Sequence, residues 1–171
     1  MILSPVLSIR QPWVGLIMGG HKWTEIRPQR RLHVGKLWIH SSRWEADAED
    51  DVREEMGDRF CWQTGAIVGH VTMLGSISGT DLERYRDGER SHLSGDELAR
   101  LDWLVGVHRD HWQDEDFVWQ YASFDEQCWN LILAEPCLLA KPIRIGGKLG
   151  MWSANVPDGT DLTLAEMPVS N

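Results

Sequence analysis

Cysteine is scarce in this chain of 171 residues, which contains only Cys61, Cys128 and Cys137. The number is odd, and the sequence has neither a Cys-x-x-Cys pair nor the Cys and His spacing of a metal site. The histidines are scattered and form no metal-binding pattern. We therefore predict reduced, mostly buried thiols in a cytoplasmic protein, with no bound metal and no cofactor.

Long apolar runs are also absent. The segment from Met1 to Val6 has neither a basic start nor a long apolar stretch, so we predict no signal peptide, no membrane span and no membrane partner. The chain is 42% hydrophobic and 25% charged, which is ordinary for a soluble globular protein. Its length fits one domain, with room for one helical insertion.

Phenylalanine and tyrosine are rare as well, with three and two residues, whereas the chain contains ten tryptophans. An indole offers a large flat face and one N–H donor, which suits both a packed core and the stacking of bases. We expect most of the tryptophans to lie in the core, with base stacking as the alternative.

An overall basic charge is missing, since the formal net charge is -9. The charges are nevertheless segregated along the chain. Residues 1–44 contain seven lysines and arginines against one glutamate, and residues 127–153 contain three against one glutamate. The acidic excess lies between them, in residues 45–126. This asymmetry predicts a local anion site within an acidic protein, the alternative being solvated surface charge.

Helical regions are predicted near the start and in the middle of the chain, and residues 43–56 are also acidic and helix-favouring. Residues 13–18 form a short apolar run that ends at a glycine pair, Gly19 and Gly20, where a left-handed residue is needed. Helical spacing also occurs within residues 80–112, where Ser94 and Glu97 have the spacing of a capping box.

The rest of the chain favours short strands. Without repeats or low-complexity tracts, the pattern predicts a mainly β fold with helices (α+β), in the form of a small β-barrel with a helical insertion. The tail over residues 157–171 has no apolar periodicity and is expected to be loose. Strands are predicted at residues 6–9, 23–27, 37–40, 66–74 and 127–133, followed by a final turn marked by Pro136, Pro142 and Gly146-Gly147.

The densest group of chemically active residues lies in the first 27 positions. Within the strand predicted at 23–27, Glu25 and Arg27 share a face, and Lys22 stands at the strand entry. A carboxylate beside two cations stays ionised and restrains them. Together with Arg10, this group keeps a net positive charge for an anion such as phosphate. A salt-bridge network without a ligand is the alternative.

The same residues carry a family resemblance. LSIRQPWVGLIMGGHKWTEIR resembles the opening of ASCH domains: a strand, Gln-Pro, a short helix, and Gly-x-Lys-x-x-Glu-x-Arg, here Gly20, Lys22, Glu25 and Arg27. KLWIHSS, GAIVGHVTM and WNLILAEPCLLAKPIRIGGKLGMW resemble later parts of the family. The resemblance covers roughly residues 5–153 and is weakest over 76–126.

The resemblance implies a PUA-like β-barrel over residues 1–156, with an acidic, partly helical insertion at about 76–126. It also implies a ligand cleft between the barrel and the short helix. ASCH domains are linked to RNA or modified-base recognition, so the expected partner is RNA, single-stranded nucleic acid or a nucleotide. Some small bacterial members are amidohydrolases that remove the acetyl group of N4-acetylcytidine, and others are associated with ribonuclease activity.

In the amidohydrolases, a Lys and a Thr of this motif and a later Glu perform the chemistry. Lys22 matches the Lys, whereas Glu25 stands at the Thr position and Thr24 falls one residue earlier. A Thr hydroxyl can act as a nucleophile when a nearby Lys accepts its proton, but Glu25 can act only as a base or as an anchor for the cations. If the chain is an enzyme, Lys22 and Glu25 are the predicted catalytic residues.

The predicted ligand-binding residues combine cations, polar groups and one indole. Gln11 is assigned to a base edge or to capping of the short helix. His40 and Ser41 are expected on a loop after the strand, with His40 in an acid or base role or in a structural hydrogen bond. Lys148 lies in a glycine turn that allows its ammonium to meet a phosphate, although the spacing is not that of a P-loop. The full set is Arg10, Gln11, Trp13, Lys22, Arg27, His40, Ser41 and Lys148.

Three functions remain open from the sequence. The first is a binding module for an extruded or single-stranded nucleotide, stacked on Trp and paired with Arg10, Lys22 and Arg27. The second is a hydrolase acting on a modified nucleoside or on RNA. The third is a protein-interaction domain that uses the acidic middle segment.

Overall fold

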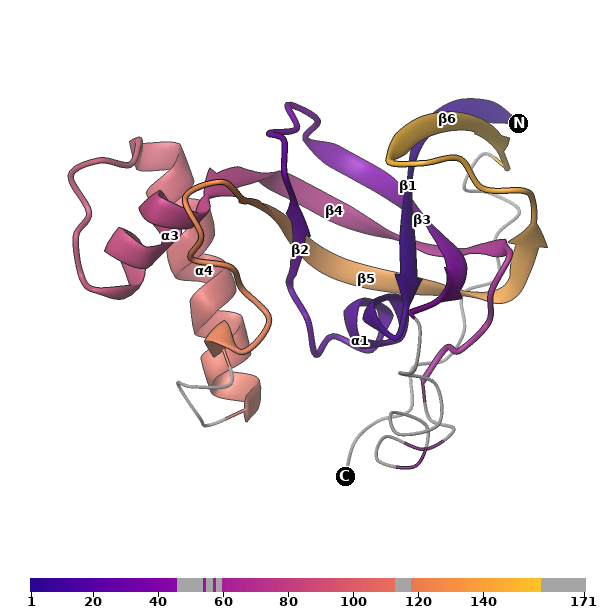
Figure 1. The fold of residues 1–171 in the computed structure, drawn as a ribbon, viewed down its shortest axis with the longest axis horizontal. Helices are drawn as coiled ribbons and strands as arrows, with labels where there is room; N and C mark the ends of the chain where they lie inside the picture. Colours follow the sequence, from indigo (N-terminus) through magenta and orange to yellow (C-terminus); the bar gives the residue numbers. More distant parts are fainter. Residues whose placement is uncertain (46–53, 55–56, 58–59, 113–117, 158–171) are drawn as a thin grey trace. The chain divides into compact units, whose positions relative to one another are not determined.

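The computed structural model describes residues 1–45, 54, 57, 60–112 and 118–157 (Figure 1). Most of the tail predicted to be loose, residues 158–171, lies outside this part, as do residues 113–117 of the predicted insertion. The elements in chain order are β1 (Ile2–Gln11), α1 (Trp13–Met18), β2 (Thr24–Arg27), β3 (Gly35–Trp44), β4 (Ala66–Ser78), α3 (Gly79–Arg86), α4 (Gly95–Trp112), β5 (Trp129–Arg144) and β6 (Met151–Val156).

The fold is mixed α+β, as predicted. Six strands pair in the order β2-β5-β4-β3-β1-β6. β1 runs parallel to β3 and antiparallel to β6, so that Val6 lies opposite both Trp38 and Trp152. β2 pairs antiparallel with β5, with Thr24 opposite Ile132. Among the described strands this order has two ends and forms no closed ring, so the barrel itself stays a prediction.

The chain divides into two compact units. The first unit comprises residues 1–22, 36–72 and those from Glu135 onward, and the second comprises residues 23–35 and 73–134. β4 and β5 each contribute residues to both units. The predicted insertion at 76–126 falls within the second unit.

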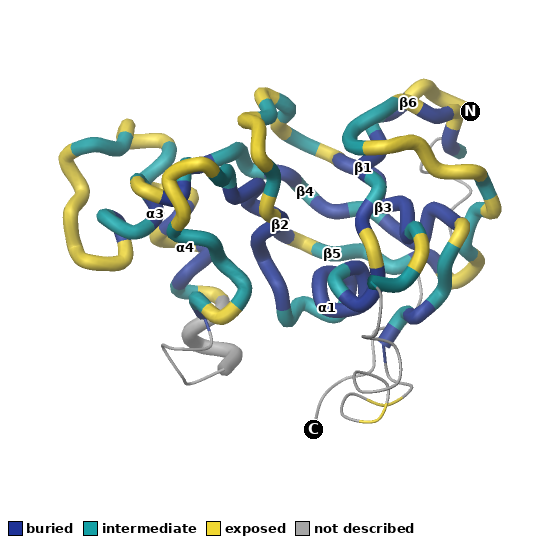
Figure 2. Tube along the Cα trace, in the orientation of Figure 1, coloured by how far each residue is buried: buried dark blue, intermediate teal, exposed yellow. Residues whose placement is uncertain are grey.

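The core of the first unit contains residues from all of its long strands, and in β3 the residues from Leu37 to Ser41 are buried without a break. Helix α1 belongs to the same unit, and every residue from Val14 to Met18 is buried, so most of the helix is dark blue in Figure 2. Gly20 has a φ of 78°, the left-handed conformation predicted for the glycine pair. The short helix is therefore confirmed. One cluster of this core consists of Val6, Trp38, Ile67, Leu139, Ala154 and Val156.

The second unit has its own core, in which residues of α3 and α4 pack with residues of β4 and β5. The predicted capping box at the start of α4 is confirmed. The Ser94 Oγ accepts a hydrogen bond from the Glu97 amide at 3.3 Å, and the Glu97 carboxylate accepts bonds from the Ser94 amide and hydroxyl at 3.0 and 2.7 Å. Leu82, Leu101, Leu104, Val118 and Ile132 are among the residues buried here.

Strand β5 is longer than predicted, because it continues through Pro136 and Pro142 to Arg144. Proline lacks an N–H donor, but a strand tolerates it at an edge or a bulge where that donor is not needed. Glu135, directly before Pro136, has a φ of 51°, a local irregularity of this kind. The backbone is therefore irregular next to Pro136, and neither proline ends the strand.

Candidate nucleic-acid interface

The predicted site residues fall in both units, and the two groups are described in turn. Glu25 and Arg27 belong to the second unit. The members in the first unit are Arg10, Gln11, Trp13, Lys22, His40, Ser41 and Lys148.

In the first unit, Glu45 connects Arg10 with Trp13. One carboxylate oxygen of Glu45 lies 3.0 Å from Arg10 Nη1, and the other accepts a hydrogen bond from Trp13 Nε1 at 3.4 Å. Trp13 is the first residue of α1, and Arg10 lies near the end of β1, so both side chains are placed by the turn that joins these elements. The indole ring is thus held at its edge by the same group that positions the guanidinium.

Lys22 lies in the chain that leaves α1, and only 5% of it is exposed. The amides of His21 and Lys22 both donate to the carbonyl of Leu16, which fixes the backbone after the helix. The Lys22 ammonium lies 5.9 Å from the centre of the Trp13 ring, within the range of a cation–π contact. A buried ammonium needs compensating partners, and the Trp13 face is one of them.

Gln11 is fully buried. Its Oε1 accepts a hydrogen bond from the Gly15 amide at 3.0 Å, and its Nε2 donates to the carbonyls of Cys61 and Gln63 at 2.8 and 3.1 Å. The side chain therefore caps α1 and holds a neighbouring loop. Of the two predicted roles, the structure supports capping, because an amide with these partners and no exposed surface cannot meet a base edge.

His40 and Ser41 are both buried and lie within β3, which corrects their predicted place on a loop after the strand. His40 Nε2 donates to the Ile145 carbonyl at 3.1 Å, since a carbonyl can only accept. In the neutral ring, Nδ1 then accepts from the Ser8 hydroxyl at 3.2 Å, and Trp152 Nε1 donates to the Ser8 Oγ at 3.0 Å. The structural alternative for His40 is therefore the one supported.

Ser41 has no exposed surface. Its Oγ has no hydrogen-bond partner among the described residues, whereas its carbonyl accepts from the Gly65 amide at 2.7 Å. It is therefore not available to an external ligand in this conformation.

Lys148 lies in the glycine turn between β5 and β6 and is exposed. Its ammonium is 5.8 Å from the centre of the Trp152 ring. The preceding residue, Gly147, packs against the His40 ring so closely that a Cβ would overlap it. In this turn, the exposed Lys148 therefore directly follows a glycine that packs on the buried, hydrogen-bonded His40 ring.

Two histidines, the buried His40 and the partly buried His70, give stability a pH dependence. Burial lowers the pKa of His40 below its usual 6.5, although the hydrogen bond to Ile145 opposes this effect. Burial and, after it, the charge of Lys36 lower the pKa of His70. The unfolded chain therefore binds protons at a higher pH than the folded chain does.

We expect the free energy of unfolding to fall as the pH drops below about 6.5, by up to roughly 1.4 kcal/mol per pH unit for each of these histidines. The loss levels off once the folded state is protonated too. Urea unfolding between pH 8 and 5.5 measures this slope. The slope of the unfolding free energy against pH should be smaller in His40→Gln than in the wild type. An unfolding free energy that stays constant over this interval would contradict the expectation.

In the second unit, Arg27 Nη2 lies 2.9 Å from Glu25 Oε1. The Glu25 side chain is 9% exposed and that of Arg27 is 24% exposed, so the pair is largely shielded from water. Their shared face agrees with the prediction. Thr24 is buried and its hydroxyl donates to the Tyr121 carbonyl at 2.8 Å, so it is engaged as a structural donor and not held as a nucleophile.

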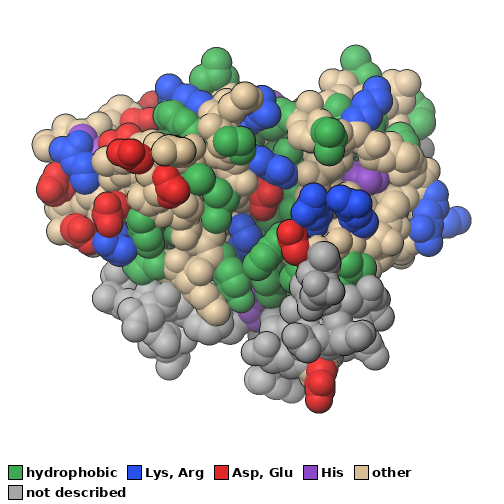
Figure 3. Space-filling model, viewed as in Figure 1, with side chains coloured by type: hydrophobic (Ala, Val, Ile, Leu, Met, Phe, Trp, Pro, Cys, Tyr) green, Lys and Arg blue, Asp and Glu red, His purple; other side chains and the backbone are tan. Residues whose placement is uncertain are grey.

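Acidic side chains are not spread evenly over the helices and strands. In Figure 3 the acidic side chains gather mainly over the helices α3 and α4 of the second unit.

Within the described part of the chain, no group of three His, Cys, Asp or Glu residues is arranged to hold a metal ion. In that same part, none of the helices is long and apolar enough to cross a membrane.

Comparison with known proteins gives a family. The ASCH domain family matches residues 7–135, so the chain belongs to the ASCH domain family. No curated protein matches its sequence. Among solved structures, the chain is similar to ASCH from Zymomonas mobilis, with 14% identity, coverage of 82% of this chain and 73% of that one, and a TM-score of 0.42.

Two single-substitution mutants of the Zymomonas mobilis protein are also similar. The mutant in which a serine is replaced by alanine has 13% identity, coverage of 89% of this chain and 88% of that one, and a TM-score of 0.46. The mutant in which a tyrosine is replaced by phenylalanine has 15% identity, coverage of 82% and 75%, and a TM-score of 0.41.

Proposed function

We propose that this ASCH-family chain binds RNA, single-stranded nucleic acid or a nucleotide through a basic cleft around Trp13, Arg10 and Lys22. The observation that carries the proposal is the arrangement of these three side chains, an indole with one cation on its face and another fixed near its edge by Glu45. We also propose that the domain extends over residues 1–156 as a PUA-like barrel, with residues of about 76–126 as an insertion.

An aromatic face next to cations suits a single-stranded ligand. A base can stack on an indole whatever its identity, and this contributes about 1–3 kcal/mol per base. A lysine or arginine beside the ring then meets the phosphate of the same nucleotide. Lys148, beside Trp152, is a further cation of the first unit and is proposed to contact the backbone of a longer strand.

Glu45 does not block this site. The Arg10 and Glu45 side chains are 49% and 41% exposed, and an ion pair this accessible contributes only about 0–1 kcal/mol. A phosphate can therefore take the place of Glu45 on Arg10. Arg27 differs, because its shielded partner Glu25 already neutralises it, so we assign it a smaller share of the binding.

A hydrolase is the second candidate, favoured by the buried Glu25 carboxylate held by Arg27. It would act on a modified nucleoside such as N4-acetylcytidine, or on RNA as a ribonuclease, with Glu25 as base and Lys22 as the second catalytic residue. Release of acetate from N4-acetylcytidine, abolished in Lys22→Ala, would support this candidate. Absence of turnover on modified nucleosides and on RNA would remove it.

Salt dependence tests the binding proposal. For a single strand, the logarithm of the association constant should fall with the logarithm of the salt concentration, with a slope of about -0.7 for each phosphate contacted. Fluorescence anisotropy with labelled oligouridylate and oligothymidylate measures this slope and compares RNA with DNA. No binding, or binding that is insensitive to salt, would contradict a phosphate site and favour the protein-interaction module.

A further inference from the structure

The second unit contains a pocket whose lining includes none of the predicted site residues. Its volume is about 130 Å³, and half of the residues that line it are aliphatic. The apolar walls come from β4, β5 and α4, through Leu74, Ile77, Ile132 and Leu101. An engineered apolar cavity of about 150 Å³ is large enough to hold benzene, so this pocket has room for about one six-membered ring.

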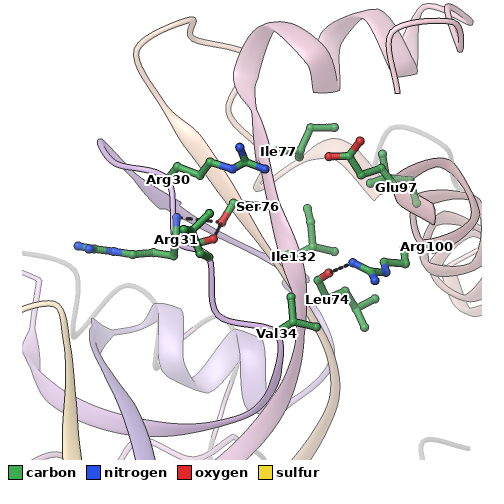
Figure 4. Close-up of a pocket in the computed structure, with 12 residues that line it drawn as sticks. Arg30, Arg31, Val34, Leu74, Ser76, Ile77, Glu97, Arg100 and Ile132 are labelled. Atoms are coloured by element: carbon green, nitrogen blue, oxygen red, sulfur yellow. Dashed lines mark hydrogen bonds between the residues drawn. The ribbon is translucent and has the colours of Figure 1, made fainter. Parts of the chain in front are cut away.

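Charged side chains surround this apolar space. Figure 4 shows the Arg30 side chain directed toward Ile77 and Glu97, and Arg100 reaching toward Leu74. Arg100 Nη1 donates to the Leu74 carbonyl at 2.7 Å, and the Arg30 guanidinium lies 5.3 Å from the centre of the Trp129 ring. Both arginines therefore have partners in the folded chain that orient them before any ligand arrives.

The charge at the pocket favours an anion. Hydrogen bonds from Ser94, and then the charges of Arg30 and Arg100, lower the pKa of Glu97, so this carboxylate is ionised at neutral pH. Its Oε2 is already engaged by the Ser94 amide and hydroxyl. Two guanidinium groups against one carboxylate leave a net positive charge. Arg31 is not counted toward the charge in the pocket, because its side chain extends away from the pocket in Figure 4.

We propose that this pocket is a binding site for a small anionic molecule that carries one ring-sized apolar group, with the ring on the aliphatic walls and the anion on Arg30 and Arg100. The site does not depend on the proposed nucleic-acid binding, since it uses different residues of a different unit. A guanidinium recognises both carboxylate and phosphate through paired hydrogen bonds. The anion is therefore either of these, and the test separates them.

The test is a methyl NMR titration of the full chain with benzoate, with phenyl phosphate and with uncharged benzyl alcohol. At least one anion should shift the Ile77 and Ile132 methyl signals in a saturable way, with a Kd in the millimolar range or below. That anion should bind at least about fivefold more tightly than benzyl alcohol. The tighter of the two anions identifies carboxylate or phosphate as the recognised group.

Two substitutions sharpen the result. Arg30→Gln should weaken binding of the anion about fivefold and leave benzyl alcohol unchanged, whereas the matched control Arg31→Gln should change neither. Val34→Trp, at an exposed position of the lining, should abolish binding by filling the entrance without disturbing the core. Equal affinity for charged and uncharged probes, equal effects of Arg30→Gln and Arg31→Gln, or shifts that do not saturate would overturn the proposal.

Discussion

Replacing Lys22 by alanine is expected to weaken binding of single-stranded RNA at least about tenfold, which corresponds to about 1.4 kcal/mol. The reason is that a charge-assisted bond to phosphate is lost at a site where the lysine is only 5% exposed and packs over Trp13. Fluorescence anisotropy at one fixed salt concentration measures the loss. The slope against salt should also become shallower by about 0.7, one contact fewer.

Lys141→Ala is the matched control, because it removes the same charge from an exposed position in the first unit. It should change affinity less than about twofold. Since Lys22 is buried, Lys22→Met is compared as well, because it keeps most of the side-chain volume while removing the charge. If Lys22→Met folds with an unchanged Tm and binds RNA like the wild type, or if both lysines give equal losses, Lys22 is not a phosphate contact.

Gly147→Ala is expected to lower the free energy of unfolding by about 1–3 kcal/mol. A Cβ at this position would overlap the imidazole ring of His40, which hydrogen bonds to Ser8 and Ile145 hold in place. The ring cannot move without losing one of those bonds. Chemical denaturation at pH 8, where His40 is neutral because burial lowers its pKa, measures the effect apart from the titration of this ring.

Gly146→Ala provides the comparison for that experiment. A Cβ at Gly146 would meet nothing within 4 Å, so the substitution should leave stability unchanged or raise it by up to about 1 kcal/mol by restricting the unfolded chain. The two glycines are adjacent in one turn, so the difference between them isolates the contact with His40. Equal stabilities of the two variants would show that the turn can yield around a methyl group.

The parts of the fold that could be predicted are those with local signals. Helix α1 follows from an apolar run between a proline and a glycine pair, and the start of α4 follows from Ser94 and Glu97, three residues apart. Strand lengths could not be predicted in this way. β1 reaches from Ile2 to Gln11 because β3 and β6 supply its hydrogen-bond partners, and the local sequence does not encode that pairing.

In the candidate site, only the contacts between residues that are close in the sequence could be predicted. The pairing of Glu25 with Arg27 follows from the alternation of a strand. Glu45 was missed, because it meets Arg10 and Trp13 from more than thirty positions away, and no local pattern marks such a contact. Ser8 and Trp152 are 144 positions apart, so their hydrogen bond and the burial of His40 that accompanies it depend on the completed sheet.

The arginines of residues 30 and 31 illustrate the same limit. The sequence contains two adjacent identical side chains and cannot distinguish them. In the structure, Arg31 is held through its backbone by the Ser76 hydroxyl and extends outward, whereas Arg30 turns toward the aliphatic pocket. Which of them can meet a ligand is decided by β4, more than forty residues later in the chain.

The position of β1 between β3 and β6 has a consequence for synthesis on the ribosome. One edge of β1 can pair once Gly35–Trp44 has followed, but the other edge must wait for Met151–Val156. Until then a nascent chain presents the backbone groups of Ile2–Leu7 to water or to other strands. The last turn before β6, which carries Gly147 and Lys148, therefore leaves the ribosome just before the segment that completes this edge.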